Sequence, residues 1–197
     1  KDGKNTKFRC FSASQEVQYT NVYNSRKHNF DLLRKANHEE MVKLINSSLP
    51  ENAGIVRIHV AGDFFSLPYM HAWYMVAALN PNVLFYAYTK SLRYWVGGIN
   101  ELPILHNFVL TASYGGRDDH MIDEFNLRSA KVVFSEAEAA ELGVAIDHDD
   151  SHAAKPTLRD DSFALLIHGT QPAGSQASVA LKELKGKGSY SRKKIKV

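Results

Sequence analysis

The sequence predicts an α/β fold in which a mostly parallel sheet is bent into a partial (β/α) barrel of the TIM type. Short segments rich in Val, Ile, Leu and Phe alternate with helical segments, which is typical of parallel strands buried between helices. The repeat of roughly 25 residues suits the βα units of a barrel. An open doubly wound sheet is the alternative, because it is built from the same alternation. Both architectures place a site at the C-terminal ends of the strands.

Residues 1–50 are expected to form a helical N-terminal region. Ser14 is suited to cap a helix, an apolar stripe runs on to Leu49, and Pro50 stops it. The expected strands are 55–61, 83–89, 107–113, 131–134 and 163–168. The expected helical segments beyond residue 50 are 66–79, 94–102, 118–125, 135–142 and 175–184.

Capping residues justify the boundaries of two of these helices. Ser66 is a suitable N-cap, and Pro68 lies near the first turn, where a missing N–H is tolerated. Ser135 caps the 135–142 helix, and Gly143 is a residue that commonly ends one. Helices that follow the strands this closely favour a parallel sheet with right-handed crossovers.

Length and composition indicate one globular domain. The chain has 197 residues, of which 44% are hydrophobic and 23% are charged, and this is enough for a sizeable core. We expect residues 1–185 to form this domain and residues 186–197 to form a flexible basic tail. No apolar run approaches the length of a membrane span and there is no signal peptide, so no membrane partner is expected. A chain that begins at Lys1 without Met is typical of a fragment or a processed product.

Basic residues are concentrated at the C-terminus, although the net charge of +3 is too small to indicate nucleic acid by itself. The cations there are Lys182, Lys185, Lys187, Arg192, Lys193, Lys194 and Lys196. One interpretation is a solvated tail. The other is an arm that contacts the phosphates of nucleic acid, with binding that weakens as salt rises. The oligomeric state is not readable from the sequence.

Polar side chains fall on one face of several expected strands. Successive strand residues point to opposite faces, so Arg57, His59 and Asp63 share a face. The apolar Ile58 and Val60 lie on the other. The same pattern recurs in later strands, and the predicted inner set is Arg57, His59, Asp63, Tyr86, Tyr88, Lys90, Thr111, Ser113, Ser135 and His168. Such residues either line a site or form a hydrogen-bonded network that packs the interior of a barrel.

The loops that follow the strands are rich in small and hydroxylated residues. They are Gly62-Asp63, 89–91, 113–117 and 168–172. Exposed amides and hydroxyls of this kind suit a polar ligand such as a carboxylate or a phosphate. The pair Gly115-Gly116 is equally compatible with a simple turn.

A run of acids and histidines from Asp147 to His152 is a candidate metal site. His148, Asp150 and His152 supply the imidazole and carboxylate groups that divalent metals bind. The alternative is a surface loop that caps the segment after it. Cys10 is a further candidate ligand, but as the single thiol it cannot form a disulfide within the chain, and by itself it is expected to be an ordinary buried residue. One cysteine also suits a reducing compartment.

Five blocks of the sequence resemble the bacteriophage gene product 88 domain family. They are Thr6–Gln15, Arg57–Phe65, Leu84–Ser91, Phe108–Ser113 and Ile146–His152, and together they span nearly the whole chain. The family in turn is similar to radical S-adenosylmethionine enzymes, which have a partial (β/α) barrel. The resemblance implies a phage-encoded protein that works in the host cytoplasm.

The resemblance to radical enzymes implies S-adenosylmethionine and an iron–sulfur cluster as cofactors. Gly62 and Asp63 stand where those enzymes contact the amino group of the cofactor, and Thr111 and Ser113 would flank its carboxylate or ribose. Ser135 belongs to the same cofactor-binding group. The chain departs from the pattern, since it has Asp in place of Glu and no Cys-x-x-x-Cys-x-x-Cys. Its one cysteine would need partners outside this chain to hold a cluster.

Three functions are compatible with these residues. The first is a radical S-adenosylmethionine-like enzyme acting on a nucleotide or nucleic acid. Its catalytic residues would be His59, Asp63, Lys90 and His168, and its substrate-binding residues Arg57, Tyr86, Tyr88 and Lys90. The second is a non-enzymatic protein that binds nucleic acid or a host protein through the basic tail. The third is metal-dependent hydrolysis or nuclease action through Asp63, His59 and the 148–152 loop.

Overall fold

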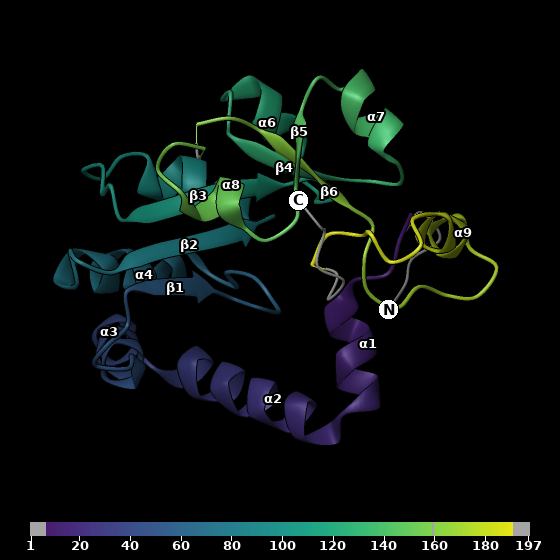
Figure 1. Cartoon of the computed structure of the whole chain (residues 1–197). Coiled ribbons are helices and arrows are strands. Elements are labelled where there is room, and N and C mark those ends of the chain that lie inside the picture. Colours follow the sequence, from purple (N-terminus) through teal and green to yellow (C-terminus); the bar gives the residue numbers. More distant parts are fainter. Residues whose placement is uncertain (1–6, 159, 191–197) are drawn as a thin grey trace.

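The sheet has six strands, all parallel, in the order β1-β2-β3-β4-β6-β5 (Figure 1). The structure, a computed structural model, describes residues 7–158 and 160–190. The strands are β1 (Ile55–Ile58), β2 (Leu84–Thr89), β3 (Phe108–Ser113), β4 (Ser129–Val133), β5 (Ala145–Asp147) and β6 (Phe163–Leu166). The predicted α/β class with a parallel sheet is confirmed. β1 and β5 stand at the two ends of the strand order.

In the described part of the chain, three helices precede β1, one follows β6, and the others connect the strands. The helices are α1 (Phe11–Gln18), α2 (Thr20–Lys35), α3 (His38–Ser48), α4 (Leu67–Leu79), α5 (Leu92–Tyr94), the π-helix η1 (Trp95–Ile99), α6 (His120–Glu124), α7 (Glu136–Glu141), α8 (Ser151–Ala154) and α9 (Gln176–Glu183). Each expected strand has a counterpart among β1–β6. Each expected helix after residue 50 has a counterpart among the helices from α4 to α9. Within the described ranges, no helix combines the length and the apolar character needed to cross a membrane.

Two short elements, β5 and α8, are absent from the expected strands and helices. β5 pairs in parallel with β6, so that β6 lies between β4 and β5. A strand of three residues is too short to show an alternating pattern in the sequence, which explains why it is not predicted.

One face of the sheet is covered by several helices, and the main core lies there. Apolar residues of β1, β2 and β3, such as Ile58, Phe85 and Leu110, pack against α3 and α4. Farther along the sheet, Val133 and Leu166 pack against α7 on the same face. Because neighbouring residues in register point to the same side, the alternate residues of these strands must point to the opposite face.

That opposite face carries the polar positions of the strands and is covered more thinly. Tyr86, Phe163 and Leu165 pack there against Ala153 of the short helix α8. Arg57 is in register with Tyr86, so it shares this face. Near the ends of the strands, this face therefore carries polar side chains as well as core residues.

From residue 7 onward, the N-terminal region forms three helices. Ser14, the expected cap, lies inside α1, and the residue before that helix is Cys10, whose side chain makes no capping bond. α3 begins with a capping box in which the side chains of Asn37 and Glu40 each accept the other's backbone N–H. No described residue of α2 is buried. In Figure 1, α1 and α2 form an arm below the sheet, which we call the N-terminal arm (residues 11–35).

Part of the predicted C-terminal tail is packed into the fold. The hydroxyl of Ser189 accepts from the backbone N–H of Leu166 at 2.9 Å and donates to the carbonyl of Asp147 at 2.5 Å. It therefore joins β6 and β5. A Cβ atom at Gly188 would lie 2.4 Å from the carbonyl oxygen of Ile167, so the chain approaches β6 too closely for a side chain there. Residues 191–197, which include four of the predicted basic residues, lie outside the described residues.

Candidate functional site

The carboxylate of Asp150 gathers polar groups from three separate parts of the chain. Its Oδ2 accepts from Arg57 Nη1 in β1 at 2.7 Å and from the Tyr86 hydroxyl in β2 at 3.0 Å. Its Oδ1 accepts from the hydroxyls of Tyr88 at 2.9 Å and Tyr190 at 2.5 Å. The Asp150 side chain is only 12% exposed, and these donors supply the hydrogen bonds that a buried carboxylate needs. We call these five residues the Asp150 cluster.

Charge within the Asp150 cluster is held in one ion pair. The guanidinium of Arg57 lies over the rings of Tyr88 and Tyr190, at 5.2 and 5.5 Å from their centroids. Burial lowers the pKa of Arg57, but Asp150 and the nearby tyrosines outweigh this effect and leave its pKa above the ordinary value. Burial raises the pKa of all three tyrosines, and Asp150 adds to the effect. The phenols therefore stay neutral around neutral pH.

The loop that presents Asp150 is braced from within. The buried Asp147 accepts hydrogen bonds from the backbone N–H groups of Asp149 and His152, both at 3.0 Å. Asp150 has a φ of 67°, in the left-handed region that Asp tolerates better than most residues. This acidic run serves as a turn that places one carboxylate beside β1 and β2.

The predicted metal ligands are not brought together. Asp150 is occupied by the donors described above, and His152 Nδ1 lies 3.7 Å from Asp147 Oδ2. The carbonyl of His148 accepts from the C-terminal segment at 2.9 Å. Cys10 is exposed at the start of α1, in contrast to the buried thiol that we expect from the sequence. Within residues 7–158 and 160–190, no group of three His, Cys, Asp or Glu residues is arranged to hold a metal ion.

A second carboxylate, that of Asp63, ties the end of β1 to the end of β2. Its Oδ1 accepts from the backbone N–H of Phe64 at 2.7 Å and from the hydroxyl of Thr89 at 2.6 Å. Its Oδ2 accepts from the backbone N–H of Lys90 at 2.7 Å. Three donors hold this carboxylate in place, so Asp63 fixes the path of the loop after β1.

Lys90 reaches from the end of β2 to the end of β3. Its Nζ donates to the carbonyl and the hydroxyl of Ser113, both at 3.0 Å, and also to the carbonyl of Tyr114. Burial of the ammonium group lowers the pKa of Lys90, although Asp119 and Asp63 oppose the effect. Three neighbouring strand ends are thus connected through Asp63, Lys90 and Ser113.

Three predicted ligand positions are filled by the protein itself. The N–H groups of Gly115 and Gly116 both donate to the Asp119 carboxylate at 2.8 Å, so they form a turn closed by that side chain. The hydroxyl of Thr111 accepts from the guanidinium of Arg128. Ser135 is the N-cap of α7, where its hydroxyl accepts a backbone N–H at 3.1 Å. The polar groups at these positions therefore form hydrogen bonds with other groups of the protein.

Strand alternation predicts that His59 shares the face of Arg57. In the structure it does not. β1 ends at Ile58, and His59 has a φ of 61°, which turns its ring to the side of α4. Its Nε2 is hydrogen bonded to the hydroxyl of Tyr69 at 2.8 Å, and the ring meets Phe64 edge-on and lies 6.4 Å from the centroid of Trp73. Burial lowers the pKa of His59 to about 4, so the imidazole is neutral around neutral pH.

The other ring nitrogen of His59, Nδ1, is buried and has no hydrogen-bond partner among the described residues. Buried polar atoms without partners are uncommon in proteins, and each one points to a missing contact such as a water or a ligand. Within the described residues, Nδ1 of His59 is one of four such atoms, the others being Arg57 Nε, Trp73 Nε1 and His152 Nδ1.

His59 lines a groove of about 750 Å³ between the N-terminal arm and the body of the protein, which we call the helical groove. Its lining residues are Glu16, Tyr23, Arg26, Lys27, Asn29, Phe30, Leu32, Leu33, Leu44, Ile45, Ser48, His59, Ala61, Gly62, Asp63, Phe65, Tyr69 and Trp73. Aromatic and aliphatic side chains form most of this surface. Two cations, Arg26 and Lys27, come from α2.

His168 lies at the end of β6, beside the Asp150 cluster. Its ring meets the ring of Tyr190 edge-on at 5.0 Å, and its Nδ1 is hydrogen bonded to the carbonyl of Leu166 at 3.0 Å. Burial lowers the pKa of His168. The ring therefore contacts the Asp150 cluster through Tyr190.

The structure sorts the predicted site residues into three groups. Arg57, Tyr86, Tyr88 and His168 meet around Asp150; Asp63, Lys90 and Ser113 connect strand ends; His59 and Gly62 line the helical groove. Sequence reasoning missed Tyr190 and Asp119. A tyrosine within an otherwise basic tail, and an acid four residues after Gly115, were the available signals.

Comparison with known proteins gives two matches in sequence. A model of the gene product 88 family matches residues 3–185 of the chain. The chain is also 34% identical over 90 residues to the Gene 88 protein of Mycobacterium phage L5, and this match takes in 41% of the chain and 38% of that relative. No solved structure gives a significant match.

Proposed function

The chain belongs to the gene product 88 family of bacteriophage proteins, and we propose that it binds a nucleotide-class ligand in the helical groove. The observation that carries the proposal is the buried, unpartnered Nδ1 of His59 in the wall of a groove of about 750 Å³. Pockets of about 300–1,000 Å³ hold small-molecule ligands in other proteins. The groove also lies at the C-terminal end of a parallel strand, where α/β proteins bind their ligands.

The chemistry of the lining residues supports a ligand with a flat ring and an anionic group. Phe30, Phe65 and Trp73 offer apolar and aromatic surface to a base. Arg26 and Lys27 are paired with Glu16 and Asp31, respectively, in partly exposed ion pairs. Such pairs contribute roughly 0–1 kcal/mol, so a phosphate can compete for either cation.

The neutral His59 ring supplies a polar contact within this apolar surface. Because its pKa is lowered to about 4, the ring presents either a donor or an acceptor at Nδ1 and no charge. Tyr69 holds the ring through Nε2, so the orientation of Nδ1 is fixed. A hydrogen bond from Nδ1 to a base or a ribose would satisfy the unpartnered atom. Asp63 shapes the groove by holding the adjoining loop.

Tryptophan fluorescence tests the proposal directly, because Trp73 lines the groove. In a Trp95→Phe background, Trp73 is the remaining tryptophan, and AMP, dTMP and S-adenosylmethionine are titrated as ligands. We expect saturable quenching by at least one of them. His59→Gln retains a polar group near the position of Nε2 but loses Nδ1, and should weaken binding about tenfold, the effect of one lost hydrogen bond to a buried group.

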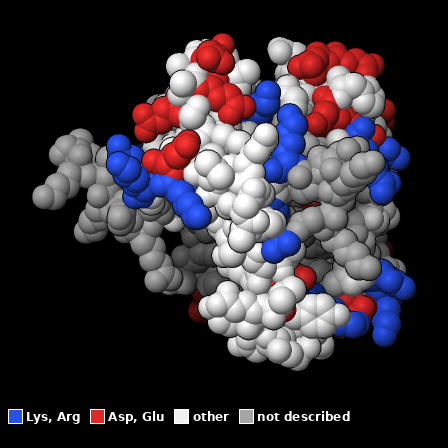
Figure 2. All heavy atoms as spheres, turned by 90° about the vertical axis from the view of Figure 1, so that its right-hand side faces the viewer, with Lys and Arg blue, Asp and Glu red and all other residues white. Residues whose placement is uncertain are grey.

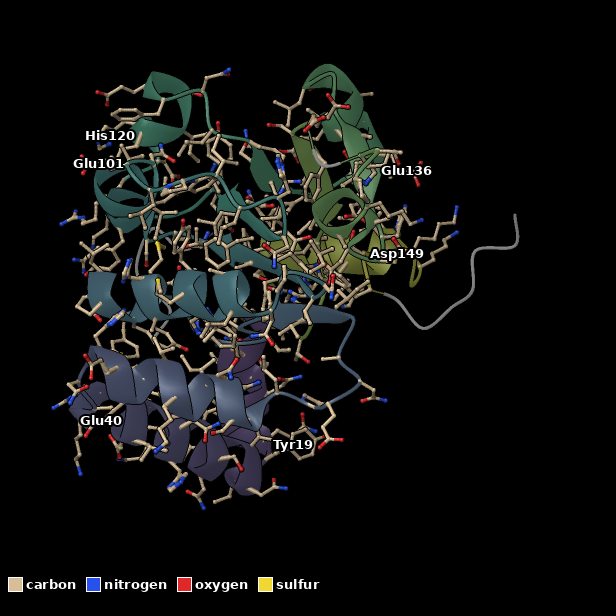
Figure 3. The ribbon with its side chains drawn as sticks, turned by 90° about the vertical axis from the view of Figure 1, so that its left-hand side faces the viewer. Tyr19, Glu40, Glu101, His120, Glu136 and Asp149 are labelled. Carbon is tan, nitrogen blue, oxygen red and sulfur yellow. The ribbon has the colours of Figure 1, made fainter. Side chains whose placement is uncertain are left out.

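Two control variants define the role of Nδ1. His59→Asn keeps a polar atom near the position of Nδ1 and should bind more tightly than His59→Gln. His120→Gln alters a histidine on the side of the molecule opposite Tyr19 and Glu40, as Figure 3 shows, and should bind like the unaltered protein. Absence of quenching by every nucleotide and nucleoside at millimolar concentration would contradict the proposal.

The residues present do not fit an iron–sulfur cluster. The chain has a single cysteine, whereas [4Fe–4S] clusters are held by several thiolates. Asp63, Thr111 and Ser113, which the resemblance to radical enzymes assigns to S-adenosylmethionine, are bonded to other groups of the chain. We therefore propose no step through these cofactors. S-adenosylmethionine stays in the ligand panel because it contains an adenosine.

The two remaining hypotheses require contacts other than a nucleotide in the helical groove. Hydrolysis by a divalent metal would require Asp63 or Asp150 to exchange its present hydrogen-bond donors for a metal ion. Nucleic-acid binding by the tail is tested by deleting residues 191–197, with loss of salt-dependent binding as the supporting result. Location of the protein in the host cytoplasm, as expected from the sequence, agrees with the proposal, because free nucleotides are abundant there.

A further inference from the structure

A second groove lies beside the helical groove and shares two residues with it. It has a volume of about 540 Å³ and is lined by Phe30, Arg34, Ala36, Asn37, His38, Met41, Phe65, Ser66 and Pro68; we call it the α3 groove. Phe30 of α2 and Phe65 of the loop after β1 belong to both grooves. Each volume is large enough for one small ligand. Phe30 and Phe65 therefore stand between two adjacent sites.

The rings between the two grooves form a continuous series. The rings of Phe65 and Tyr69 are stacked, with centroids 4.3 Å apart and planes 12° apart. Phe30 meets Phe65 edge-on at 5.2 Å, and the guanidinium of Arg34 lies over the Phe30 ring at 5.8 Å. Phe30 is 40% exposed, so part of its surface is free to contact a ligand. Exposed aromatic side chains on which successive bases stack are typical of single-strand-binding proteins.

The charge of α2 complements a polyanion. The helix carries Arg26, Lys27, Arg34 and Lys35 against Asp31. Arg26 and Lys27 line the helical groove and Arg34 lines the α3 groove. Acidic side chains gather at the upper edge of the face shown in Figure 2, over α6 and α7, far from α2. A phosphate backbone that follows α2 would meet cations at both grooves.

We infer that the ligand is a single-stranded oligonucleotide with one base in each groove and its phosphates along α2. The inference rests on the proposed function, because one of its bases occupies the helical groove. Each part of the ligand has a counterpart in the structure: the bases meet the grooves and the Phe30 ring, and the phosphates meet the cations of α2. A duplex would fit poorly, since its bases are stacked on one another and not on the protein.

Fluorescence anisotropy with labelled oligonucleotides tests this inference on the full chain. The probes are oligo-dT and oligo-U of one, two, four and eight nucleotides, together with an eight-base-pair duplex. We expect affinity to rise more than tenfold from one nucleotide to two or more. The duplex should bind more weakly than the single strand. Binding should weaken with salt, with a slope on a double logarithmic plot of about −0.7 for each phosphate contacted.

Matched variants separate the α3 groove from the helical groove. Arg34→Ala should weaken binding of the octamer about tenfold and reduce the salt slope by about 0.7, while mononucleotide binding is unchanged. Lys43→Ala, which removes an exposed cation of α3 that lines neither groove, is its control. Phe30→Leu removes the flat ring, and we expect a loss of about tenfold, typical of one stacked base. Phe125→Leu alters another exposed phenylalanine and should have no effect.

The outcomes distinguish this inference from the proposed function. Equal affinity for mononucleotides and for longer oligonucleotides would overturn the inference and leave the proposed function standing. Equal binding of duplex and single strand would also overturn it, because charge alone would then explain the affinity. Failure of both mononucleotides and oligonucleotides to bind would refute both proposals. Circular dichroism spectra that match the unaltered protein would show that the variants are folded.

Discussion

Asp150 joins β1, β2 and the C-terminal segment through one carboxylate. Its donors come from positions 57, 86, 88 and 190, so the side chain fixes the distance between segments that are far apart in the sequence. The ion pair with Arg57 is largely buried, since the Arg57 side chain is 25% exposed. When a mostly buried ion pair loses one partner, the remaining charge stays buried with no opposite charge beside it.

Asp150→Asn is therefore expected to destabilise the protein by about 2–3 kcal/mol. The substitution tolerates the left-handed backbone, but it replaces an acceptor oxygen by an NH₂ group that faces donors. Urea denaturation followed by circular dichroism measures the change. Asp161→Asn, at an exposed position, is the control and should leave the midpoint unchanged. Equal midpoints for the two variants would show that the Asp150 cluster contributes little to stability.

His59 should make stability depend on pH. Its pKa is lowered from the ordinary 6.5 to about 4 in the folded protein, mainly by burial. Between these values the unfolded chain binds a proton that the folded protein does not, so stability falls as the pH drops from about 6.5 to about 4. The loss from this group is at most about 3 kcal/mol. Comparing urea midpoints between pH 4 and pH 7 for the unaltered protein and His59→Asn measures it.

The comparison isolates His59 from other histidines. Burial also lowers the pKa of His71 and His168, so both contribute a pH dependence of the same sign in both proteins. His59→Asn keeps a residue type that adopts positive φ readily. An identical pH dependence in the two proteins would mean that His59 is not buried as a neutral group.

At single residues, prediction from sequence depended on whether the backbone stayed regular. Arg57, Tyr86 and Tyr88 share a face, as alternation predicts, because they lie within β1 and β2. His59 lies one residue beyond β1 at a φ of 61°, and alternation fails at that point. Asp150 is a candidate metal ligand or a loop residue in the sequence, because a sequence does not reveal which donors a carboxylate will meet.

At the scale of elements, residues 188–190 are predicted as part of a flexible tail, but they form hydrogen bonds with β5 and β6. The hydroxyl of Ser189 bonds to both β5 and β6, and Tyr190 donates its N–H to the carbonyl of His148 at 2.9 Å. β5 has only three residues, so these contacts support a very short edge strand. The segment holds the C-terminal ends of β5 and β6 together.

Gly188→Ala tests how tightly this segment is packed. A methyl group there would lie 2.4 Å from a backbone carbonyl oxygen of Ile167, which cannot move without disturbing the end of β6. We expect a loss of about 2–3 kcal/mol, typical of overpacking against backbone. Gly54→Ala is the matched control, because nothing lies within 4 Å of its added methyl group. Thermal denaturation should show a lower midpoint for Gly188→Ala alone.

Elements with a clear pattern were predicted, and elements set by distant contacts were not. The five longest strands and the helices capped by Ser66 and Ser135 have strong local signals. β5 depends on β6 for its pairing and on Ser189 for its support, so its own three residues carry little information. The position of β6 between β4 and β5 is likewise a property of the assembled sheet.

At the scale of the whole molecule, the N-terminal arm is attached less firmly than the sheet. α2 has no buried residue; Leu33 is partly buried against the main core, and Phe30 meets Phe65 edge-on. The strands β2 and β3, by contrast, contain Phe85, Leu110 and other core residues. Segments with few buried apolar contacts open more readily than the core.

Hydrogen exchange should therefore separate the arm from the body. We expect the amides of α2 to exchange at least tenfold faster than those of β2, since local opening of the arm requires less free energy. Saturation with the ligand that quenches Trp73 should slow exchange in residues 20–35 and leave β2 unchanged. Protection of α2 equal to that of β2 in the free protein would mean that the arm is an integral part of the core.

The Asp150 cluster has a consequence for the moment at which the protein becomes complete during synthesis. Arg57 and Asp150 are 93 positions apart. At the usual 5–20 residues per second, Asp150 is synthesised roughly 5–20 s after Arg57 and roughly 3–13 s after the tyrosines of β2. Tyr190 follows 40 positions after Asp150. A nascent chain thus exposes a cationic, tyrosine-lined strand end until Asp150 and Tyr190 emerge, and a ribosome stalled before Tyr190 would display an incomplete Asp150 cluster to the chaperones of the cell.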